Sequence, residues 1–486
     1  MKHYEELTGG EGRRIFYRAE RFDAKTLMSS ISPVVDVQDK SFDLLDVSMS
    51  GISFVSPQST SWLDELNKDV PLSLKLDSTE IFAGRGTIRR IEPLKSQQIV
   101  ALEFTKGYLD IKKILRRHDE ISLQKSIQAG MQDTTELVPG EYKQLISDAI
   151  FLLRSARTTL EEIEAELSPD MPRRDERIRD TVIDCEKIAF ARWKEFYKQG
   201  NKIVCEIRHD PKIVNAVKRY TEATLMPELM AGKLWNRSYT KPLGYPGDFQ
   251  VMNYFYNISL LGETAYEKFC HKLGYSSGEV ISFRMTMVRQ AIARLTALAA
   301  ERGKSSFDVA SLGCGPAQEV RNFLKADVLP LPVSFTLIDQ DHEALTYAYE
   351  NSFPEVARLN GQAKVNCLHT SFVQFLSAGK LVGKLGLQDL VYSVGLVDYL
   401  SARQANRFVT GLYGKLKPGG TIIVGNMRHS EDSLEWLLDY VTDWKLEYRT
   451  EDEMLAMADK IEPEAKREVL ADVTGHCHLL LVTKPE

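Results

Sequence analysis

Short apolar runs with alternating polar residues dominate the first part of the chain. Turn-forming residues separate these runs between residues 11 and 110, and the clearest runs span residues 41–55, 72–76, 81–91 and 98–104. Apolar residues at every second position are typical of strands with one buried face. Because no helical pattern precedes residue 110, this spacing predicts a small β-barrel over residues 1–110.

A helical period replaces the strand pattern after residue 110. Pro169 ends a helix whose apolar residues recur at alternating spacings of three and four, at Ile146, Ala149, Leu153, Ala156, Leu160, Ile163 and Leu167. Such a stripe either packs an amphipathic helix onto its own domain, or forms a coiled-coil-like seam with a second copy or an interdomain strut. We therefore expect a helical region over residues 111–280 and keep a homodimer through it as the alternative.

A glycine turn marks the third part of the chain, residues 281–486. Residues 307–319 read F-D-V-A-S-L-G-C-G-P-A-Q-E, an apolar run that stops at Gly313 and Gly315 before helix-forming residues. Glycines at such a turn let the backbone bend sharply and let a ligand approach closely. This arrangement is typical of an open α/β sheet that receives a nucleotide-like ligand at its strand ends.

The following strand supplies a matching acid. It spans residues 333–338 and ends at Asp339, where doubly wound folds place a carboxylate that accepts hydrogen bonds from ribose hydroxyls. A dinucleotide fingerprint would carry glycine at position 318, where this chain has Gln318. Further apolar strands follow at residues 364–368, 389–394, 421–425 and 478–483. Together these strands predict a doubly wound sheet.

This order resembles the class I S-adenosylmethionine (SAM) methyltransferases, whose glycine loop, ribose acid and L-K-P-G-G turn (residues 416–420 here) have the same spacing. Ala317 stands where many members have a third glycine. The resemblance covers residues 280–486 and implies a seven-stranded, Rossmann-like domain with SAM as its cofactor. The residues then expected to line the ribose, adenine and methionine parts of SAM are Gly313, Cys314, Gly315, Asp339, Gln340, Thr370, Ser371, Phe372, Ser393 and Val394.

A rigid loop interrupts the helical region at residues 241–249, K-P-L-G-Y-P-G-D-F. Two prolines and two glycines fix its shape, so it is either an ordinary turn or a lid beside the methyl donor. This loop, together with Y-S-V-G-L-V-D-Y at residues 392–399, resembles the bacterial methyltransferase group that makes 3-hydroxypalmitic acid methyl ester. The resemblance implies a fatty-acid-type carboxylate as acceptor, with Tyr245, Asp248, Asp398 and Tyr399 as catalytic or substrate-side candidates.

Two further motifs lie in the β-rich segment. Arg14 and Arg18 place two guanidinium groups four residues apart, and Asp46, Ser48 and Gly51 follow as D-x-S-x-x-G. Guanidinium forks match phosphate oxygens and the acceptor edge of guanine, while a carboxylate accepts from guanine N–H groups. A pair of arginines alone would more often form a solvated face.

Both motifs in this order resemble the PilZ domain, which binds the bacterial messenger cyclic di-GMP. The resemblance assigns binding to Arg14, Arg18, Asp46, Ser48 and Gly51. Arg13 adds a third guanidinium, which suits the four phosphate charges of an intercalated messenger dimer.

Composition and charge argue against several other classes of protein. The 486 residues carry a net charge of −6, which gives no global electrostatic case for nucleic-acid binding. The six cysteines are scattered, the first residues are charged and no apolar run is long enough to span a bilayer, so we expect a cytoplasmic protein. His476 and His478 lack a third nearby ligand, so no metal site is expected.

The sequence therefore favours a cytoplasmic, cyclic di-GMP-responsive and SAM-dependent methyltransferase that acts on a small molecule. Messenger binding is expected to reach the methyltransferase through the helical region. One rival is a non-catalytic cyclic di-GMP effector that uses the methyltransferase fold as a scaffold. A second rival, a nicotinamide-dependent enzyme, is disfavoured by Gln318 and by the strand order.

Overall fold

The computed structural model describes residues 22–24, 33–38, 40–48, 50–76, 79–94, 97–105, 109–110, 114, 116–117, 120, 134–325, 328–370 and 385–486. The chain divides into two compact units, Leu7–Glu136 and Leu137–Glu486. Each unit has its own hydrophobic core. Arg13, Arg14, Arg18, Ser371 and Phe372 lie outside the described residues.

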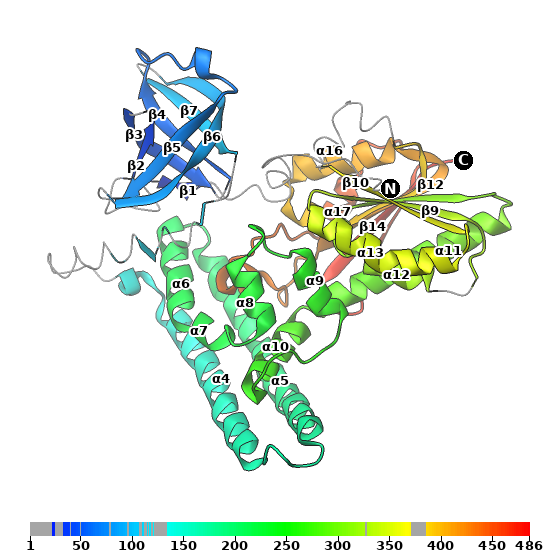
Figure 1. Cartoon of the computed structure of the whole chain (residues 1–486), viewed down its shortest axis with the longest axis horizontal. Helices are drawn as coiled ribbons and strands as arrows, with labels where there is room; N and C mark the ends of the chain where they lie inside the picture. The colour runs from blue at the N-terminus through cyan, green and yellow to red at the C-terminus, as the bar shows by residue number, and fades with distance from the viewer. Residues whose placement is uncertain are drawn as a thin grey trace. The chain divides into compact units, whose positions relative to one another are not determined.

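The first unit contains a closed ring of antiparallel strands in the order β3-β2-β5-β6-β7-β4, with β4 pairing back onto β3 and the short β1 added to β3 (Figure 1). The predicted barrel is therefore present. Its strands are β1 (Phe22–Asp23), β2 (Pro33–Val37), β3 (Lys40–Ser48), β4 (Gly51–Pro57), β5 (Asp69–Leu76), β6 (Thr79–Leu94) and β7 (Gln97–Phe104), with a 3-10 turn η1 (Leu63–Glu65).

Alternating burial along the strands fills the barrel. In β5, every second residue from Val70 to Leu76 is buried, as the period of two predicts. Trp62 closes the core with its indole ring 5.5 Å from the rings of both Phe42 and Phe54. The prediction of a single strand over residues 41–55 is wrong, because the chain turns between Ser48 and Gly51 and folds back as β3 and β4.

Gly51 begins β4 and lies opposite Glu103 of β7. A Cβ atom at this position would stand 2.3 Å from the Leu102 carbonyl oxygen, so the two backbones approach too closely for any other residue. Ser48 closes the same hairpin by donating its hydroxyl hydrogen bond to the Gly51 carbonyl oxygen at 2.9 Å. Both residues thus have a demonstrable role in closing the barrel.

We expect Gly51→Ala to destabilise the barrel by about 1–3 kcal/mol, because the added methyl group collides with backbone that cannot move alone. Hydrogen exchange of the β4 and β7 amides measures the loss. Gly140→Ala is the matched control, since a Cβ there meets no described atom within 4 Å. Unchanged exchange in both strands of the Gly51 variant would contradict this account.

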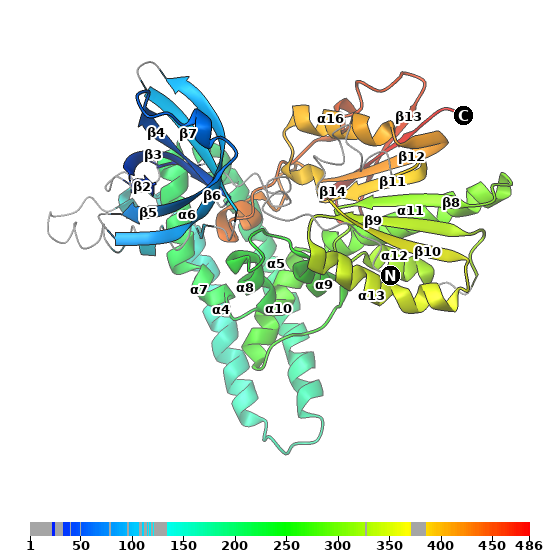
Figure 2. The same cartoon turned by 45° about the horizontal axis from the view of Figure 1, so that its top comes forward.

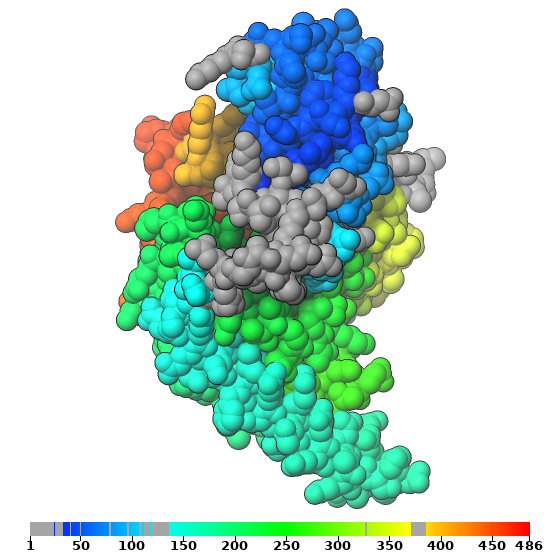
Figure 3. All heavy atoms as spheres, turned by 90° about the vertical axis from the view of Figure 1, so that its left-hand side faces the viewer, coloured from blue at the N-terminus to red at the C-terminus, as the bar shows by residue number. Residues whose placement is uncertain are grey.

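The second unit begins with helices. The long helices α4 and α5 form a hairpin whose closed end projects from the helices at its base (Figures 1 and 3). The helices are α4 (Gly140–Glu166), α5 (Arg174–Ile207), α6 (Pro211–Thr224), α7 (Met226–Leu229), α8 (Lys233–Thr240), α9 (Phe249–Tyr256), α10 (Ala265–Ser277) and α11 (Val280–Glu301), preceded by the 3-10 turn η2 (Thr134–Leu137).

The apolar stripe of α4 packs inside this unit. Its residues from Ile146 to Leu160 are buried in the same core as residues of α5, α6 and α10. This part of the stripe is therefore covered by the chain's own helices, and a homodimer through the helical region stays a prediction.

A seven-stranded sheet completes the second unit, in the order β10-β9-β8-β11-β12-β14-β13. Its first five strands are parallel, and β14 runs antiparallel to both of its neighbours. The helices α12 and α13 lie on one face and α16 on the other (Figures 1 and 2). The strands are β8 (Phe307–Leu312), β9 (Val333–Asp339), β10 (Ala363–His369), β11 (Gln388–Val394), β12 (Leu416–Met427), β13 (Lys466–Ala471) and β14 (Cys477–Thr483).

Shorter elements connect these strands. They are α12 (Gln318–Leu324), α13 (His342–Arg358), the 3-10 turn η3 (Val397–Tyr399), α16 (Ala402–Tyr413), the π-helical turn η4 (Trp436–Val441) and α17 (Glu451–Ala456). Within the described ranges, no helix combines the length and the apolar character needed to cross a bilayer.

The helices and the sheet share one core. Trp193 of α5 lies between Trp235 of α8 and Trp436 of η4, with ring centroids 6.2 and 6.3 Å away. Asn201 of α5 donates to the Ser433 carbonyl oxygen at 2.7 Å and accepts from the Trp436 N–H at 2.9 Å. The segment after β12 is thus anchored in the helical region.

Candidate functional site

The glycine turn lies at the carboxyl end of β8, beside the end of β9. Gly313 and Gly315 have φ angles of 64° and 51°, and the N–H of Gly313 donates to the Ile338 carbonyl oxygen at 2.8 Å. Ala317 also has a positive φ, 49°, where a glycine would be less strained. A Cβ at Gly315 would meet no described atom within 4 Å, so the backbone there is open to a ligand.

Asp339 links this turn to β9 through a hydrogen bond. Its carboxylate accepts the N–H of Gly315 at 2.9 Å and the N–H of Asp341 at 3.0 Å, and only 7% of the residue is exposed. Burial raises the pKa of Asp339 to about 6, although these backbone hydrogen bonds act in the opposite direction. The predicted ribose acid therefore sits beside the predicted glycine turn.

The neighbouring loop adds polar groups to this edge. The Thr370 N–H donates to the Asp339 carbonyl oxygen at 3.0 Å, and His369 Nε2 lies 2.8 Å from the Gln340 carbonyl oxygen. The side-chain oxygen of Gln340 is buried without a hydrogen-bond partner among the described residues. Such an oxygen suits a ligand that carries an N–H or O–H donor. Ser371 and Phe372, the next two residues, lie outside the described residues.

The end of β11 lies beside the glycine turn, because β11 pairs with β8. Ser393 is fully buried and donates its hydroxyl hydrogen bond to the Leu312 carbonyl oxygen at 3.0 Å. Beside it, the Tyr392 hydroxyl donates to Glu319 at 2.7 Å. Burial raises the pKa of Glu319. Ser393 thus links β11 to β8, while Val394 ends the strand partly exposed. Cys314 is buried, and burial raises the pKa of its thiol.

The loop at residues 241–249 joins two sides of this edge. Tyr245 donates its hydroxyl hydrogen bond to Asp341 at 2.7 Å, and Asp341 lies two positions after Asp339 in the chain. On the other side, Lys241 contacts Asp443 at 2.8 Å, and a Cβ at Gly247 would stand 2.4 Å from the Trp444 ring. The loop is therefore a wall beside the carboxyl end of β9, and Tyr245 contacts that strand end through Asp341.

Asp248 holds the base of this wall. Its carboxylate accepts the N–H groups of Gln250 and Val251 at the start of α9 and pairs with Arg237 at 2.9 Å. The residue is 1% exposed. These contacts give Asp248 a positioning role, and a contact with substrate stays a prediction.

Removing this carboxylate should cost more stability than a lost helix cap. We expect Asp248→Ala to lower the free energy of unfolding by about 3–5 kcal/mol, because it leaves Arg237 without its buried partner. Asp210→Ala is the matched control: Asp210 caps α6 in the same way but is exposed, so about 1 kcal/mol is expected. Equal losses in urea denaturation would contradict the importance of the ion pair.

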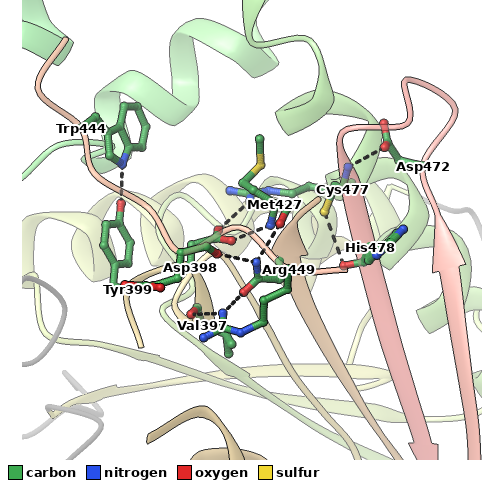
Figure 4. Close-up of polar contacts among 12 residues, drawn as sticks. Val397, Asp398, Tyr399, Met427, Trp444, Arg449, Asp472, Cys477 and His478 are labelled. Atoms are coloured by element: carbon green, nitrogen blue, oxygen red, sulfur yellow. Dashed lines mark hydrogen bonds and ion pairs between the residues drawn. The ribbon is translucent and has the colours of Figure 1, made fainter. Parts of the chain in front are cut away.

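Asp398 and Tyr399 lie near the end of β12 and the start of β14 (Figure 4). Asp398 accepts the N–H of Met427 at 2.6 Å and lies 3.5 Å from Arg284. The Tyr399 hydroxyl accepts a hydrogen bond from Trp444 Nε1 at 2.8 Å. Asp398 is therefore part of a buried polar cluster, and its predicted contact with an acceptor stays a prediction.

Sequence reasoning missed several residues of this site. Asp341 stands two positions from the predicted Asp339, and its spacing as the cap before α13 was an available signal. Arg237 and Arg284 pair with carboxylates 11 and 114 positions away, so no local motif announces the second pair. No group of three His, Cys, Asp or Glu side chains in the described ranges could hold a metal ion.

In the barrel, the D-x-S-x-x-G residues cluster at one hairpin. Asp46 lies opposite Asp23 of β1 and Ser53 of β4, two positions before Ser48. The three arginines assigned to the same messenger lie outside the described residues, so the meeting of the two motifs stays a prediction.

Comparisons with known proteins give fold-level likenesses. No family model and no curated protein matches this chain. It is similar to a possible exported protein from Bordetella parapertussis, at 16% identity and a TM-score of 0.40, over 56% of this chain and 97% of that one.

Two methyltransferase structures are also similar. One is magnesium protoporphyrin IX methyltransferase from Synechocystis PCC 6803 with bound SAM, at 11% identity and a TM-score of 0.30, over 43% of this chain and 82% of that one. The other is the N-methyltransferase NodS from Bradyrhizobium japonicum WM9, at 15% identity and a TM-score of 0.27, over 41% and 96%. At these scores the likenesses carry no argument about activity.

Proposed function

We propose that residues 281–486 form a class I, Rossmann-like methyltransferase domain that uses SAM to methylate a small molecule. One observation carries this proposal: the glycine turn is bonded to Asp339 beside the point where the strand order reverses. From β8 the chain proceeds through β9 to β10 on one side, and β11 and β12 lie on the other. Open α/β sheets bind ligands at such a reversal, outside the carboxyl ends of the strands.

The residues at this edge fit SAM. The open space at Gly315 admits a ligand close to the backbone, and the Asp339 carboxylate can accept hydrogen bonds from ribose hydroxyls. The buried Gln340 side-chain oxygen offers an acceptor to the nucleoside, with Thr370 beside it. When bound, SAM would supply an electrophilic methyl group.

What the protein contributes is alignment. Methyl transfer is a direct displacement, so orientation of the two reactants supplies much of the rate enhancement. The wall at residues 241–249, held by Asp248 and Tyr245, would restrict the acceptor and exclude water. A fatty-acid-type carboxylate, our proposed acceptor, reacts without a general base. Burial raises the pKa of the Tyr245 phenol well above its usual range, so this phenol would not supply a base.

SAM affinity should fall in acid. Ribose hydroxyls donate to the ionised form of Asp339, whose pKa is about 6 in the free protein, so binding below that pH must displace a proton. Calorimetry should show affinity falling about tenfold per pH unit below about pH 6 and no further gain from this group above it.

Asp339→Asn isolates this effect. It should bind SAM about 1–3 kcal/mol more weakly at neutral pH and lose the acid dependence assigned to position 339. Asp308→Asn, at the opposite edge of the sheet, is the control and should behave as the unaltered protein. An Asp339→Asn protein that keeps both the affinity and the pH slope would refute the ribose assignment.

We also propose that residues 1–110 are a PilZ-like receptor that makes the enzyme responsive to cyclic di-GMP. The closed barrel, with Asp46, Ser48 and Gly51 at one hairpin, supports this proposal together with the arginine motif in the sequence. Residues 111–280 would then be the helical region between receptor and enzyme.

Cyclic di-GMP should bind as an intercalated dimer, two messengers per chain. Arg13→Leu should lower the stoichiometry toward one, because it removes the third guanidinium, and Arg14→Ala should weaken binding. Arg90→Leu, which removes a barrel arginine paired with Glu92, is the matched control. Titration with one messenger per chain, or unchanged binding by Arg14→Ala, would rule out the respective assignment.

Responsiveness is tested by repeating the titration with saturating SAM. Coupling between the two ligands must be reciprocal, and a typical coupling changes each affinity about five- to 150-fold. Identical affinities with and without SAM, and identical turnover with and without messenger, would leave the barrel without a regulatory role.

A further inference from the structure

Arg284 of α11 brings a buried guanidinium to the carboxyl edge of the sheet. Only 7% of the residue is exposed. Its Nη2 atom lies 3.0 Å from the position that a Cβ on Gly395 would occupy, directly after β11. Gly395 has a φ of 140°, so a glycine is needed here both for the backbone and for the space that the guanidinium uses. The guanidinium therefore lies against the end of β11.

The described residues provide few acceptors for this group. An arginine carries five N–H donors. The polar contact of Arg284 within the described ranges is Asp398 Oδ2, 3.5 Å from Nη1, at the limit of a hydrogen bond. The other oxygen of Asp398 accepts the shorter hydrogen bond from the Met427 N–H. Most donors of Arg284 are thus available to a ligand.

A second buried arginine, Arg449, lies close to the same Asp398 carboxylate. Arg449 hydrogen bonds to neutral oxygens, those of Val397, Asn426 and Leu400 (Figure 4). Glu447 and Glu453, the other acids near Arg449, are exposed to solvent. Within the described ranges, two buried guanidinium groups therefore face one buried carboxylate.

Two other buried acids, Glu319 and Asp472, have partners of their own. Glu319 accepts the Tyr392 hydroxyl hydrogen bond, and Asp472 accepts the backbone N–H groups of His476 and Cys477. A buried guanidinium with unmet donors is costly unless an anion accepts them. A ligand carboxylate would accept the Arg284 donors that Asp398 leaves unmet.

We propose that Arg284 binds a ligand carboxylate at the end of β11. This inference rests on the proposed function and deepens it. The carboxylate comes either from the amino-acid part of the methyl donor or from the methyl acceptor. Guanidinium forks bind carboxylates through two parallel hydrogen bonds, and the packing against Gly395 places the Arg284 guanidinium at the end of β11.

Paired ligands that differ in the carboxylate separate these sources. S-adenosylhomocysteine and 5′-methylthioadenosine share the nucleoside, but the second lacks the amino-acid carboxylate. Dodecanoate and dodecanamide share a chain, but the amide is neutral. Binding of all four to the unaltered protein and to Arg284→Met is measured by calorimetry.

We expect Arg284→Met to weaken one carboxylate ligand at least about tenfold and to change its neutral counterpart less than about twofold. Loss confined to S-adenosylhomocysteine assigns Arg284 to the donor, and loss confined to dodecanoate assigns it to the acceptor. The proposal is overturned if both members of each pair change equally, if neither changes, or if the unaltered protein prefers neither carboxylate.

Two further variants guard against a loss of folding. Arg284→Lys keeps the charge without the fork, and Arg284→Met combined with Asp398→Asn keeps the cluster's charge balance. The same comparison is made on whichever variant melts like the unaltered protein, and Arg449→Lys is the control for the other buried arginine. Dodecanoate binding that depends on Arg284, without binding of either adenosyl ligand, would sustain the carboxylate site and refute the methyltransferase proposal.

Discussion

The buried carboxylate of Asp339 determines how the carboxyl edge of the sheet is arranged. A charge removed from water must be stabilised by donors, and here the backbone N–H groups of Gly315 and Asp341 provide them. This requirement fixes the glycine turn against the end of β9. Asp341 in turn accepts the Tyr245 hydroxyl, so the wall at residues 241–249 takes its position from the same point.

Much of the fold could be predicted because buried parallel strands are continuously apolar. The runs that became β8, β9, β10, β11, β12 and β14 are of this kind. By contrast, β13 was missed, since its residues at the edge of the sheet are mostly exposed and polar. In the barrel, Ser48, Ser50 and Gly51 at the β3–β4 hairpin were an available turn signal that the prediction of one strand overlooked.

The site was predictable where chemistry follows directly from chain order. Gly313, Gly315 and Asp339 come together because adjacent parallel strands end at one edge. Side-chain direction was not predictable: Asp248 turns inward to cap α9, and Ser393 turns toward β8. The role of Arg284 could not be predicted, because the residues that it contacts, Gly395 and Asp398, are more than a hundred positions away in the chain.

The shared core of Trp193, Trp235 and Trp436 bears on how such a chain could arise by gene fusion. A break near residue 280 would separate Asn201 from Trp436 and expose large aromatic surfaces on both pieces. The boundary between the two compact units lies instead at Leu137, ahead of these aromatic side chains. Helices α4–α11 and the sheet are therefore expected to be inherited together, as one evolutionary unit.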